Sequence, residues 1–404
     1  MTKEGQNDLK ETPMDIKEEI KQKRIRLGIT QKEFADALGL GKSGDRTLRR
    51  WENGESEPSP IEFKVIMDFP EEPPFAAVTD PKFTMIDLFA GIGGVRLAFQ
   101  KAGGLSVFAS EWDKFAAKTY KINYGEEPAG DITQVPIEQI PEHNILLGGF
   151  PCQPFSQAGL KKGFEDTRGT LFFDIARILK VRKPQAFLLE NVKQLKGHNK
   201  GKTLETILRV LREDLDYTVD FKVLRAADFG VPQNRERVYI VGFYNPLGGK
   251  EIPFKFPEPL NTPTKVGDIL EKKVDEKYTI SDRLYQGHLR RKEEHKKKGN
   301  GFGFSLFNEN SVYTNTISAR YYKDGSEILI SQGEGKNPRK LTPRECARLQ
   351  GFPEEFLIPV SDTQAYRQFG NSVAVPVVEA IAKNMVEAIE KSVGFKYANE
   401  IEMV

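Results

Sequence analysis

Short apolar runs alternate with helical stretches from Phe83 to about Pro257, and this alternation is the strongest constraint on the fold. The runs are FTMIDLF, GLSVFAS, HNILLGGF, QAFLLE and VYIVGF, and several end in a glycine or an acidic residue. Strands that are separated by helices form βαβ units, which build a parallel sheet covered by helices. The sequence therefore predicts an α/β domain with a parallel sheet in this part of the chain.

Three changes in composition divide the chain. A proline-rich, acidic stretch, MDFPEEPPFAAVTDPK, is typical of a linker. After the last apolar run, a stretch richer in Lys, Gly, Asn and Tyr predicts an inserted domain of irregular strands, and helical periodicity then resumes at TPRECARLQGF. We expect five parts: a helical domain at 1–66, a linker at 67–82, the main domain at 83–257, an insertion at 258–337 and the return of the main domain at 338–404.

Composition excludes several classes of protein. The 404 residues contain two cysteines, Cys152 and Cys346, in different local contexts, so no disulfide scaffold is expected. The four histidines never fall at metal-ligand spacing with a cysteine, so no metal site is expected either. No apolar run approaches the length of a membrane span, which predicts a cytoplasmic protein. The net charge is only +2, so nucleic-acid binding would require local basic patches.

A glycine-rich turn follows the first apolar run. FTMIDLF leads into FAGIGG, where Gly91 and Gly93 permit a tight turn and the close approach of a ligand to the backbone. Glu111 ends the next strand twenty residues after Gly91, where dinucleotide-binding sheets place an acid on ribose hydroxyls. Asp131, in GDIT, is a second acidic residue that follows a further short segment. A nucleotide-type cofactor fits this pattern, although an ordinary βα turn with helix-capping acids also fits it.

Cys152 lies in PCQPFS, directly after the apolar run NILLGGF. The flanking prolines Pro151 and Pro154 stop both strand and helix, which places the thiol on a stiff loop at the carboxyl end of a strand. Thiolate chemistry needs access and a fixed direction, so Cys152 is a candidate nucleophile. Cys346 lies inside the helical stretch TPRECARLQ, where a buried, inert thiol is expected.

The next strand, QAFLLE, ends at Glu190. If the two strands are neighbours, their ends lie only ~5 Å apart, and partial burial of the carboxylate would raise its pKa and suit it to proton donation. In QNRER, Gln233, Arg235 and Arg237 alternate, so their side chains are expected to share one face of a strand beside Glu190. Helix capping by Glu190 and a solvated strand edge are the alternatives.

The N-terminal region predicts three helices within residues 15–57, in DIKEEIKQKRIRLG, TQKEFADALG and DRTLRRWENGE. Thr30 and Glu33 have the spacing of a capping box, which marks the start of the second helix. Leu38, Leu48 and Trp51 supply core positions at helical spacing.

The ordered motifs resemble the DNA (cytosine-5)-methyltransferase family: FAGIGG, EWD, GDIT, GGFPCQPFS, GFEDTRGTLFF, ENV, QNRER, TPRECARLQGFP and FGNSVAVPV. The resemblance implies a Rossmann-like methyltransferase sheet and an enzyme that protects DNA in a restriction-modification system. It implies that Cys152 attacks C6 of a flipped-out cytosine and that Glu190 protonates N3, with Arg235 and Arg237 in the same pocket. It also implies that S-adenosylmethionine contacts Phe89, Gly91, Gly93, Glu111, Trp112, Asp131, Ile132, Pro151, Leu171 and Asn371.

The same family places a target-recognition domain between QNRER and TPREC, which matches residues 258–337. The segments GNGFGF and TNTISARYYKDGSEILI resemble the recognition regions of Dcm, EcoRII and SsoII type enzymes, which act on CC-N-GG or CC-W-GG sites. Arg320 is the candidate guanine-reading residue, because arginine pairs bidentately with guanine in the major groove. A structural role for Arg320, as a bridge between the insertion and the catalytic domain, is the alternative.

The three N-terminal helices resemble a phage-repressor type helix-turn-helix. Arg46, Thr47, Arg49 and Arg50 would then meet phosphates and base edges of double-stranded DNA. The favoured hypothesis is an enzyme that also represses its own operon or that of a companion restriction endonuclease, a partner in function only. We expect catalysis by a monomer and leave open a dimer for repression. A module that only helps to hold DNA, a small helical packing module, or a tRNA cytosine methylase are the alternatives.

Overall fold

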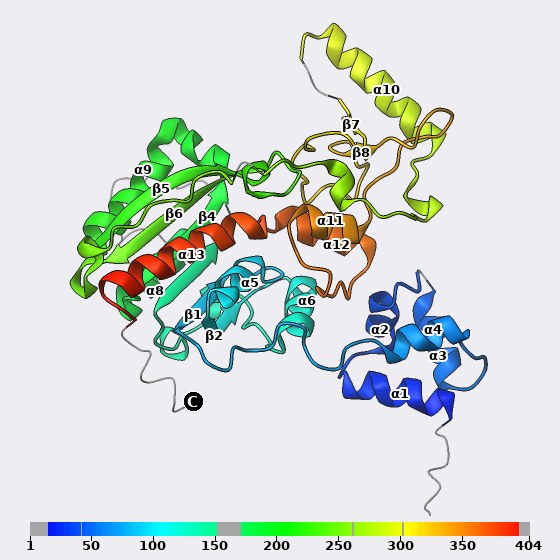
Figure 1. Ribbon diagram of the computed structural model, residues 1–404, viewed down its shortest axis with the longest axis horizontal. Helices are drawn as coiled ribbons and strands as arrows, with labels where there is room; N and C mark the ends of the chain where they lie inside the picture. Colours follow the sequence, from blue (N-terminus) through cyan, green and yellow to red (C-terminus); the bar gives the residue numbers. More distant parts are fainter. Residues whose placement is uncertain (1–14, 42, 152–170, 261, 301–302, 396–404) are drawn as a thin grey trace, which may run out of the picture. The chain divides into compact units, whose positions relative to one another are not determined.

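The computed structural model (Figure 1) describes residues 15–41, 43–151, 171–260, 262–300 and 303–395. The chain divides into two compact units, Met1–Pro73 with Pro359–Ser361, and Pro74–Ile358 with Asp362–Val404. The boundary after Pro73 lies inside the segment 67–82 that the sequence predicts to be a linker. In the described part of the chain, no helix is long and apolar enough to cross a membrane.

The first unit contains four helices within its described residues: α1 (Ile16–Arg26), α2 (Gln31–Ala37), α3 (Gly44–Glu52) and α4 (Pro60–Met67). The predicted capping box is present, since Thr30 Oγ1 accepts from Glu33 N and the Glu33 carboxylate accepts from Thr30 N. Helix α4 is not among the predicted helices, although Ser59 and Glu62 form a second capping box at its start. The helices pack around a small core of Ile20, Phe34, Ala35, Leu48, Trp51 and Ile66, with the predicted core residue Leu38 against it.

The second unit is built on a six-stranded sheet in the order β2-β1-β3-β4-β6-β5. Its strands are β1 (Phe83–Leu88), β2 (Gly104–Ser110), β3 (Ile145–Gly149), β4 (Ala186–Val192), β5 (Tyr217–Arg225) and β6 (Glu236–Tyr244). Strands β1 to β4 are parallel, but β6 is antiparallel to both of its neighbours. The prediction of a parallel sheet is therefore wrong for the VYIVGF run. The ten residues between β5 and β6 are too few for a helical crossover, so the chain reverses direction there.

Helices cover both faces of this sheet (Figure 1). Helices α8 (Leu171–Arg182) and α9 (Lys202–Arg209) pack on one face through the main hydrophobic core. Helix α5 (Gly94–Lys101) packs beside α13 (Val375–Ser392), which runs along the other face. Helix α6 (Lys114–Tyr124) follows β2. The result is a layered α/β domain whose parallel strands end together along one edge, where ligands bind in open α/β sheets.

Residues 258–337, the predicted insertion, are mostly irregular, but they are not made of strands alone. Helix α10 (Asp282–Lys297) contradicts the expectation of irregular strands. Strands β7 (Leu306–Phe307) and β8 (Leu329–Ile330) form a separate two-stranded parallel sheet. The chain then returns to the main domain through α11 (Pro343–Leu349), α12 (Asp362–Asn371) and α13.

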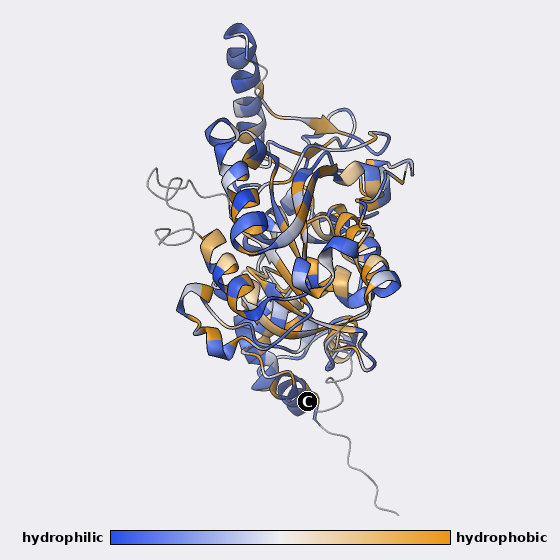
Figure 2. Cartoon of the chain, turned by 90° about the vertical axis from the view of Figure 1, so that its left-hand side faces the viewer, coloured by the Kyte–Doolittle hydropathy of each residue, from blue (hydrophilic) through white to orange (hydrophobic). Residues whose placement is uncertain are grey.

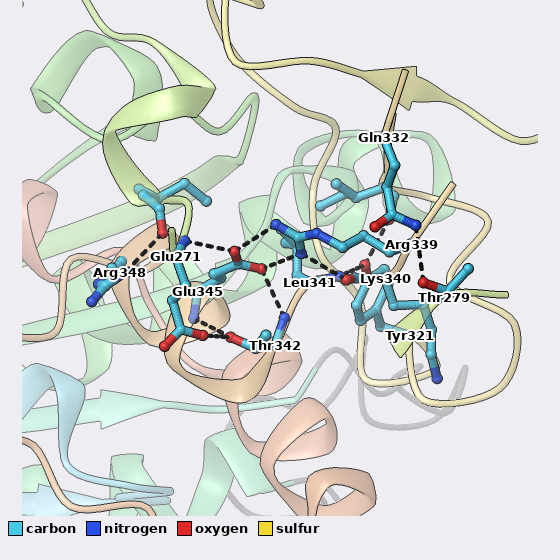
Figure 3. A network of polar contacts seen from close by, with 12 residues as sticks. Glu271, Thr279, Tyr321, Gln332, Arg339, Lys340, Leu341, Thr342, Glu345 and Arg348 are labelled. Atoms are coloured by element: carbon cyan, nitrogen blue, oxygen red, sulfur yellow. Dashed lines mark hydrogen bonds and ion pairs between the residues drawn. The ribbon is translucent and has the colours of Figure 1, made fainter. Parts of the chain in front are cut away.

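A buried ion pair joins the end of this insertion to α11 (Figure 3). The guanidinium of Arg339 donates to both carboxylate oxygens of Glu345 at 2.7 and 2.8 Å, and the Glu345 side chain is 0% exposed. The same carboxylate accepts from the backbone N–H groups of Thr342 (2.9 Å) and Glu271 (2.8 Å). Four hydrogen bonds thus compensate the desolvation of the Glu345 charge, and they connect the segment 339–345 to Glu271, 74 residues earlier in the chain.

We expect Glu345→Gln to lower the free energy of unfolding by about 3–5 kcal/mol, because it leaves the buried guanidinium of Arg339 without its countercharge. Glutamine has the same shape, but its amide nitrogen cannot accept, so the loss reports the charge together with two of the four hydrogen bonds. Urea unfolding followed by circular dichroism measures it.

The matched control is Glu354→Gln. Glu354 also pairs bidentately with an arginine, Arg348, but its side chain is 59% exposed. Exposed pairs contribute little, so this variant should change stability by at most about 1 kcal/mol. If the two variants lose equal free energy of unfolding, burial does not make the Arg339–Glu345 pair more important for stability than an exposed pair.

Candidate active site

The glycine-rich turn after β1 borders an open space. Phe89, Gly91 and Gly93 all have left-handed backbone, with φ of 55°, 56° and 80°. A Cβ on Gly93 would lie 2.3 Å from the ring of Tyr124, whereas a Cβ on Gly91 would meet nothing within 4 Å. Gly93 is therefore needed for packing against the protein, while Gly91 leaves its backbone open to an approaching ligand.

Glu111 fastens this turn to the end of β2. Its carboxylate accepts from the N–H of Gly91 at 2.8 Å and from the N–H of Asp113 at 2.7 Å. Burial raises the pKa of Glu111, although these backbone hydrogen bonds favour the charged form. The next residue, Trp112, has 78% of its surface exposed, which is unusual for an indole ring.

The other predicted cofactor residues come from neighbouring segments. Asp131 is exposed and caps a short 3₁₀ helix by accepting from Thr133 N, and Ile132 beside it is buried. Pro151 is exposed two residues beyond β3, Leu171 begins α8 and Asn371 ends α12. A Cβ on Gly94 would lie 3.0 Å from Ser372 Oγ, so the segment after Asn371 lies beside the glycine-rich turn.

Strands β3 and β4 are parallel neighbours, as a pocket shared by Cys152 and Glu190 requires. Gly149 pairs with Glu190 in the register of the two strands. Just beyond, Asn191 Nδ2 donates to Phe150 O at 2.8 Å. Cys152 itself lies outside the described residues, so the structure gives no position for the thiol.

Glu190 and Arg237 form a mostly buried ion pair at this edge. Arg237 Nε lies 3.1 Å from Glu190 Oε1, and the two side chains are only 14% and 13% exposed. Burial raises the pKa of Glu190, and the positive charges of Arg237 and Arg235 oppose this shift without cancelling it. A carboxyl group in this setting can keep a proton more readily than an exposed glutamate.

Arg235 does not contact Glu190, which corrects the expectation that three alternating side chains share one strand face. The strand begins only at Glu236, because Gln233 and Arg235 lie in tight turns before it. The buried guanidinium of Arg235 donates to the carbonyls of Ile317 (3.1 Å), Gly370 (3.2 Å) and Ser372. Burial, together with the charge of Arg237, lowers the pKa of Arg235 to about 9.

Gln233 and Arg235 together form a clamp on the backbone of Ile317. The side-chain oxygen of Gln233 accepts from the N–H of Ile317 at 3.0 Å, while Arg235 donates to the carbonyl of the same residue. Gln233 Nε2 donates to the carbonyl of Leu349 at 3.0 Å. A Cβ on Gly370 would lie 2.3–2.4 Å from backbone atoms of residues 318 and 319, so these segments pack in direct backbone contact.

Arg320 lies three residues beyond this clamp and is exposed. Within the part of the chain that the structure describes, its guanidinium has no hydrogen-bond or ion-pair partner. Its backbone N–H donates to Ser318 Oγ and its carbonyl accepts from Lys323 N. Arg320 therefore makes no bridge from the insertion to the catalytic domain among these residues. Arg235 makes that bridge instead.

In the first unit, the predicted DNA-binding residues lie on α3 opposite its packed face. Arg46, Arg49 and Arg50 are exposed, whereas Leu48 and Trp51 on the same helix are buried. Thr47 is half-buried, and its hydroxyl donates to the carbonyl of Ser43.

Arg96 supports the glycine-rich turn, a role that the sequence motifs do not assign. It is fully buried, donates to both carboxylate oxygens of Glu126 (2.7 and 2.6 Å), and lies 4.4 Å from the ring centre of Tyr124. Tyr124 in turn donates to the carbonyl of Gly93 at 2.7 Å. The sequence feature that indicates this role is an arginine within the apolar stretch VRLAF, because a buried charge needs a partner.

Cys346 is buried, as the sequence predicts.

Comparison with known proteins identifies the two units. A family model for C-5 cytosine-specific DNA methylase matches residues 83–387, and a helix-turn-helix model matches residues 20–74. Type II methyltransferase M.SsoII of Shigella sonnei is 63% identical over 372 residues, covering 92% of this chain and 98% of the relative. Type II methyltransferase M1.ScrFI of Lactococcus lactis subsp. cremoris is 63% identical over 382 residues, covering 94% and 98%.

Solved structures show the same fold. A DNMT2 mutant from Spodoptera frugiperda has a TM-score of 0.61 at 24% identity, covering 75% of this chain and 99% of that one. The methyltransferase EhMeth of Entamoeba histolytica has a TM-score of 0.61 at 21% identity, covering 77% and 98%. The prediction of a methyltransferase-type α/β sheet with an N-terminal helical domain is confirmed.

The methylase model covers most of the chain, including the strands and turns that carry the candidate site. This match confirms the predicted enzyme class, a DNA cytosine-C5 methyltransferase, and the predicted cofactor, S-adenosylmethionine. The chain belongs to the C-5 cytosine-specific DNA methylase family and carries a helix-turn-helix domain before its catalytic domain.

Proposed function

We propose that this enzyme methylates one cytosine of a specific duplex site and so protects DNA from a companion restriction endonuclease. The observation that carries the proposal is the Glu190–Arg237 pair, held at the end of β4 directly beside the end of β3. Its relatives M.SsoII and M1.ScrFI bear the name of Type II methyltransferases, which supports a role in a restriction-modification system.

The edge formed by β1, β2 and β3 suits S-adenosylmethionine. Gly91 leaves open space at the turn, and the exposed ring of Trp112 offers a flat apolar surface to an adenine. Asp131 has an exposed carboxylate that could accept from the exocyclic amine of that base. We assign the cofactor contacts to the ten residues predicted above. When bound, S-adenosylmethionine supplies an electrophilic methyl group.

The residues of β3, β4 and β6 supply the remaining chemistry. The thiolate of Cys152 adds to C6 of the flipped-out cytosine, and the carboxyl group of Glu190 donates its proton to N3 as the electrons move onto the ring. C5 of the resulting enamine takes up the methyl group. Loss of the C5 proton to a base then breaks the carbon–sulfur bond and releases the thiolate, and N3 returns its proton to Glu190 as the aromatic ring is restored. The raised pKa of Glu190 favours its protonated form, and Arg237 orients the carboxyl group toward the base.

Arg235 acts as a positioning residue in this proposal. Its contacts to Ile317, Gly370 and Ser372 join the segment that carries Arg320 to the segment beside the cofactor turn. It therefore sets the spacing between the bound DNA and the reacting methyl group, while Arg237 forms the ion pair with Glu190.

Duplex DNA with 5-fluorocytosine at the target should trap the protein covalently when S-adenosylmethionine is present. The fluorine cannot leave as a cation, so the Cys152 adduct cannot be resolved. Cys152→Ser should abolish trapping and turnover while DNA binding survives. Denaturing gel electrophoresis of labelled duplex measures the adduct.

The control is Cys346→Ala, which removes the buried thiol on α11 and should leave trapping intact. Efficient methylation by the Cys152→Ser variant would refute the nucleophile assignment. Methyl transfer to tRNA in place of duplex DNA would refute the proposed substrate.

We further propose a CC-N-GG or CC-W-GG target with the inner cytosine modified. Support comes from Arg320, whose exposed guanidinium is free, within the described residues, to pair with guanine O6 and N7. Bisulfite sequencing of DNA from expressing cells should show methylation centred on paired CC and GG, and Arg320→Ala should relax one guanine position at a cost of about 1–3 kcal/mol.

Lys323→Ala is the matched control, because this exposed lysine lies on the next turn but cannot make a bidentate contact with guanine. It should weaken binding to all sequences alike. The target assignment fails if methylation centres on a sequence without paired CC and GG. The assignment of Arg320 as a guanine-reading residue fails if Arg320→Ala weakens binding to all sequences alike, as is expected of Lys323→Ala.

The helix-turn-helix domain is proposed to bind a second, promoter-proximal sequence and to repress transcription there. The exposed arginines of α3 support this role, because they face away from the core of the domain. Arg49→Ala or Arg50→Ala should weaken promoter binding by about 1–3 kcal/mol if the residue reads a base, with methylation specificity unchanged. Gel-shift titration with upstream DNA measures this.

Lys21→Ala on α1 is the control, since this lysine is exposed but lies outside the recognition helix. Its promoter binding should match that of the unmodified protein. If the full-length protein prefers no sequence beyond its methylation target, the domain only helps to hold DNA.

A further inference from the structure

Helix α10 has one buried face and one strongly basic face. Leu284, Tyr285 and Leu289 pack against a small core formed by Ile280, Phe304 and Leu329. On the opposite side, Arg283, Arg290 and Lys297 recur every seven residues, so they form one stripe along the helix. The stripe is exposed throughout.

The cations of this stripe are not neutralised. Within the described ranges, the side chains of Arg283, Arg290 and Lys297 have no hydrogen-bond or ion-pair partner, and the same holds for the side chains of Lys296 and Lys298. Residues 282–298 contain seven Lys and Arg against three Asp and Glu, a net charge of +4 where the whole chain carries only +2. Figure 2 shows this helix as a hydrophilic rod that projects from the rest of the insertion.

Contacts with Asp324 fix the helix beside the proposed recognition segment. His288, buried on the packed face of α10, lies with Nε2 3.2 Å from the carbonyl of Asp324, and Arg291 pairs with its carboxylate at 3.3 Å. Asp324 is only four residues from Arg320 along the chain. The helix is therefore held by the turn that follows the candidate base-reading residue.

We propose that the exposed stripe of α10 binds the phosphate backbone of the DNA that flanks the methylation site. The inference rests on the proposed function, because it takes the occupant to be the substrate duplex. Charge complementarity favours DNA, since lysine and arginine that neutralise phosphates release condensed counterions. The 16-residue helix is ~24 Å long, which spans about seven base pairs at ~3.4 Å each.

The test compares full-length protein with the triple variant Arg283→Gln, Arg290→Gln, Lys297→Gln. Affinity is measured by fluorescence anisotropy across a range of salt concentrations, on a duplex that ends at the target site and on one extended by about ten base pairs on each side. On the extended duplex, the slope of log affinity against log salt should fall by about 0.9 for each phosphate that the variant no longer neutralises. On the short duplex, the variant and the unmodified protein should differ little.

The control variant Lys250→Gln, Lys383→Gln, Lys391→Gln removes the same charge from the turn after β6 and from α13. It should leave the salt slope unchanged. A second variant, Arg283→Lys with Arg290→Lys, keeps the charges and should retain the slope of the unmodified protein. Thermal melting checks that each variant is folded.

Equal slopes for the α10 triple variant and the control would overturn the proposal, as would equal losses of affinity on short and extended duplexes. Failure of the proposed function is distinguishable, because the unmodified protein would then not form the 5-fluorocytosine adduct on the short duplex. A stripe that instead serves an acidic protein partner would leave the DNA slopes unchanged and would equally overturn the proposal.

Discussion

The hydrogen bonds to Ile317 hold the segment that carries Arg320 to the residues that lead into the catalytic sheet. Gln233 binds its N–H and Arg235 binds its carbonyl, so both backbone polar groups of one residue are held by the few residues that precede β6. The same strand then carries Arg237 to Glu190. The position of the candidate recognition residue Arg320 and the position of the candidate acid thus depend on one short segment of backbone.

Burial explains why this arrangement is well defined. A buried guanidinium is costly unless its donors are satisfied, so Arg235 requires the carbonyls of Ile317, Gly370 and Ser372 in fixed positions. The Arg339–Glu345 pair imposes a similar requirement at the other end of the insertion. Such interactions disfavour other arrangements, because a mispositioned segment would leave a charge buried without a partner.

Charges at the surface, unlike buried charges, do not require partners within the protein. Arg320 and the stripe on α10 are exposed and, among the described residues, lack intramolecular partners, which leaves them available to a polyanion. On α3, the exposed arginines likewise lie opposite the buried Leu48 and Trp51. The interior cations thus join distant segments around the candidate site, and the exterior cations are the ones proposed to bind DNA.

The sequence by itself determined the features that short-range patterns encode. Apolar runs and glycine turns predicted the α/β sheet, Thr30 and Glu33 predicted a helix start, and ordered motifs predicted the family. Only the tertiary structure decided the reversed direction of β6 and the partners of Arg235, which lie 82 to 137 residues away along the chain. Local periodicity is set by neighbouring residues, whereas the partner of a buried charge depends on which distant segments the folded core brings beside it.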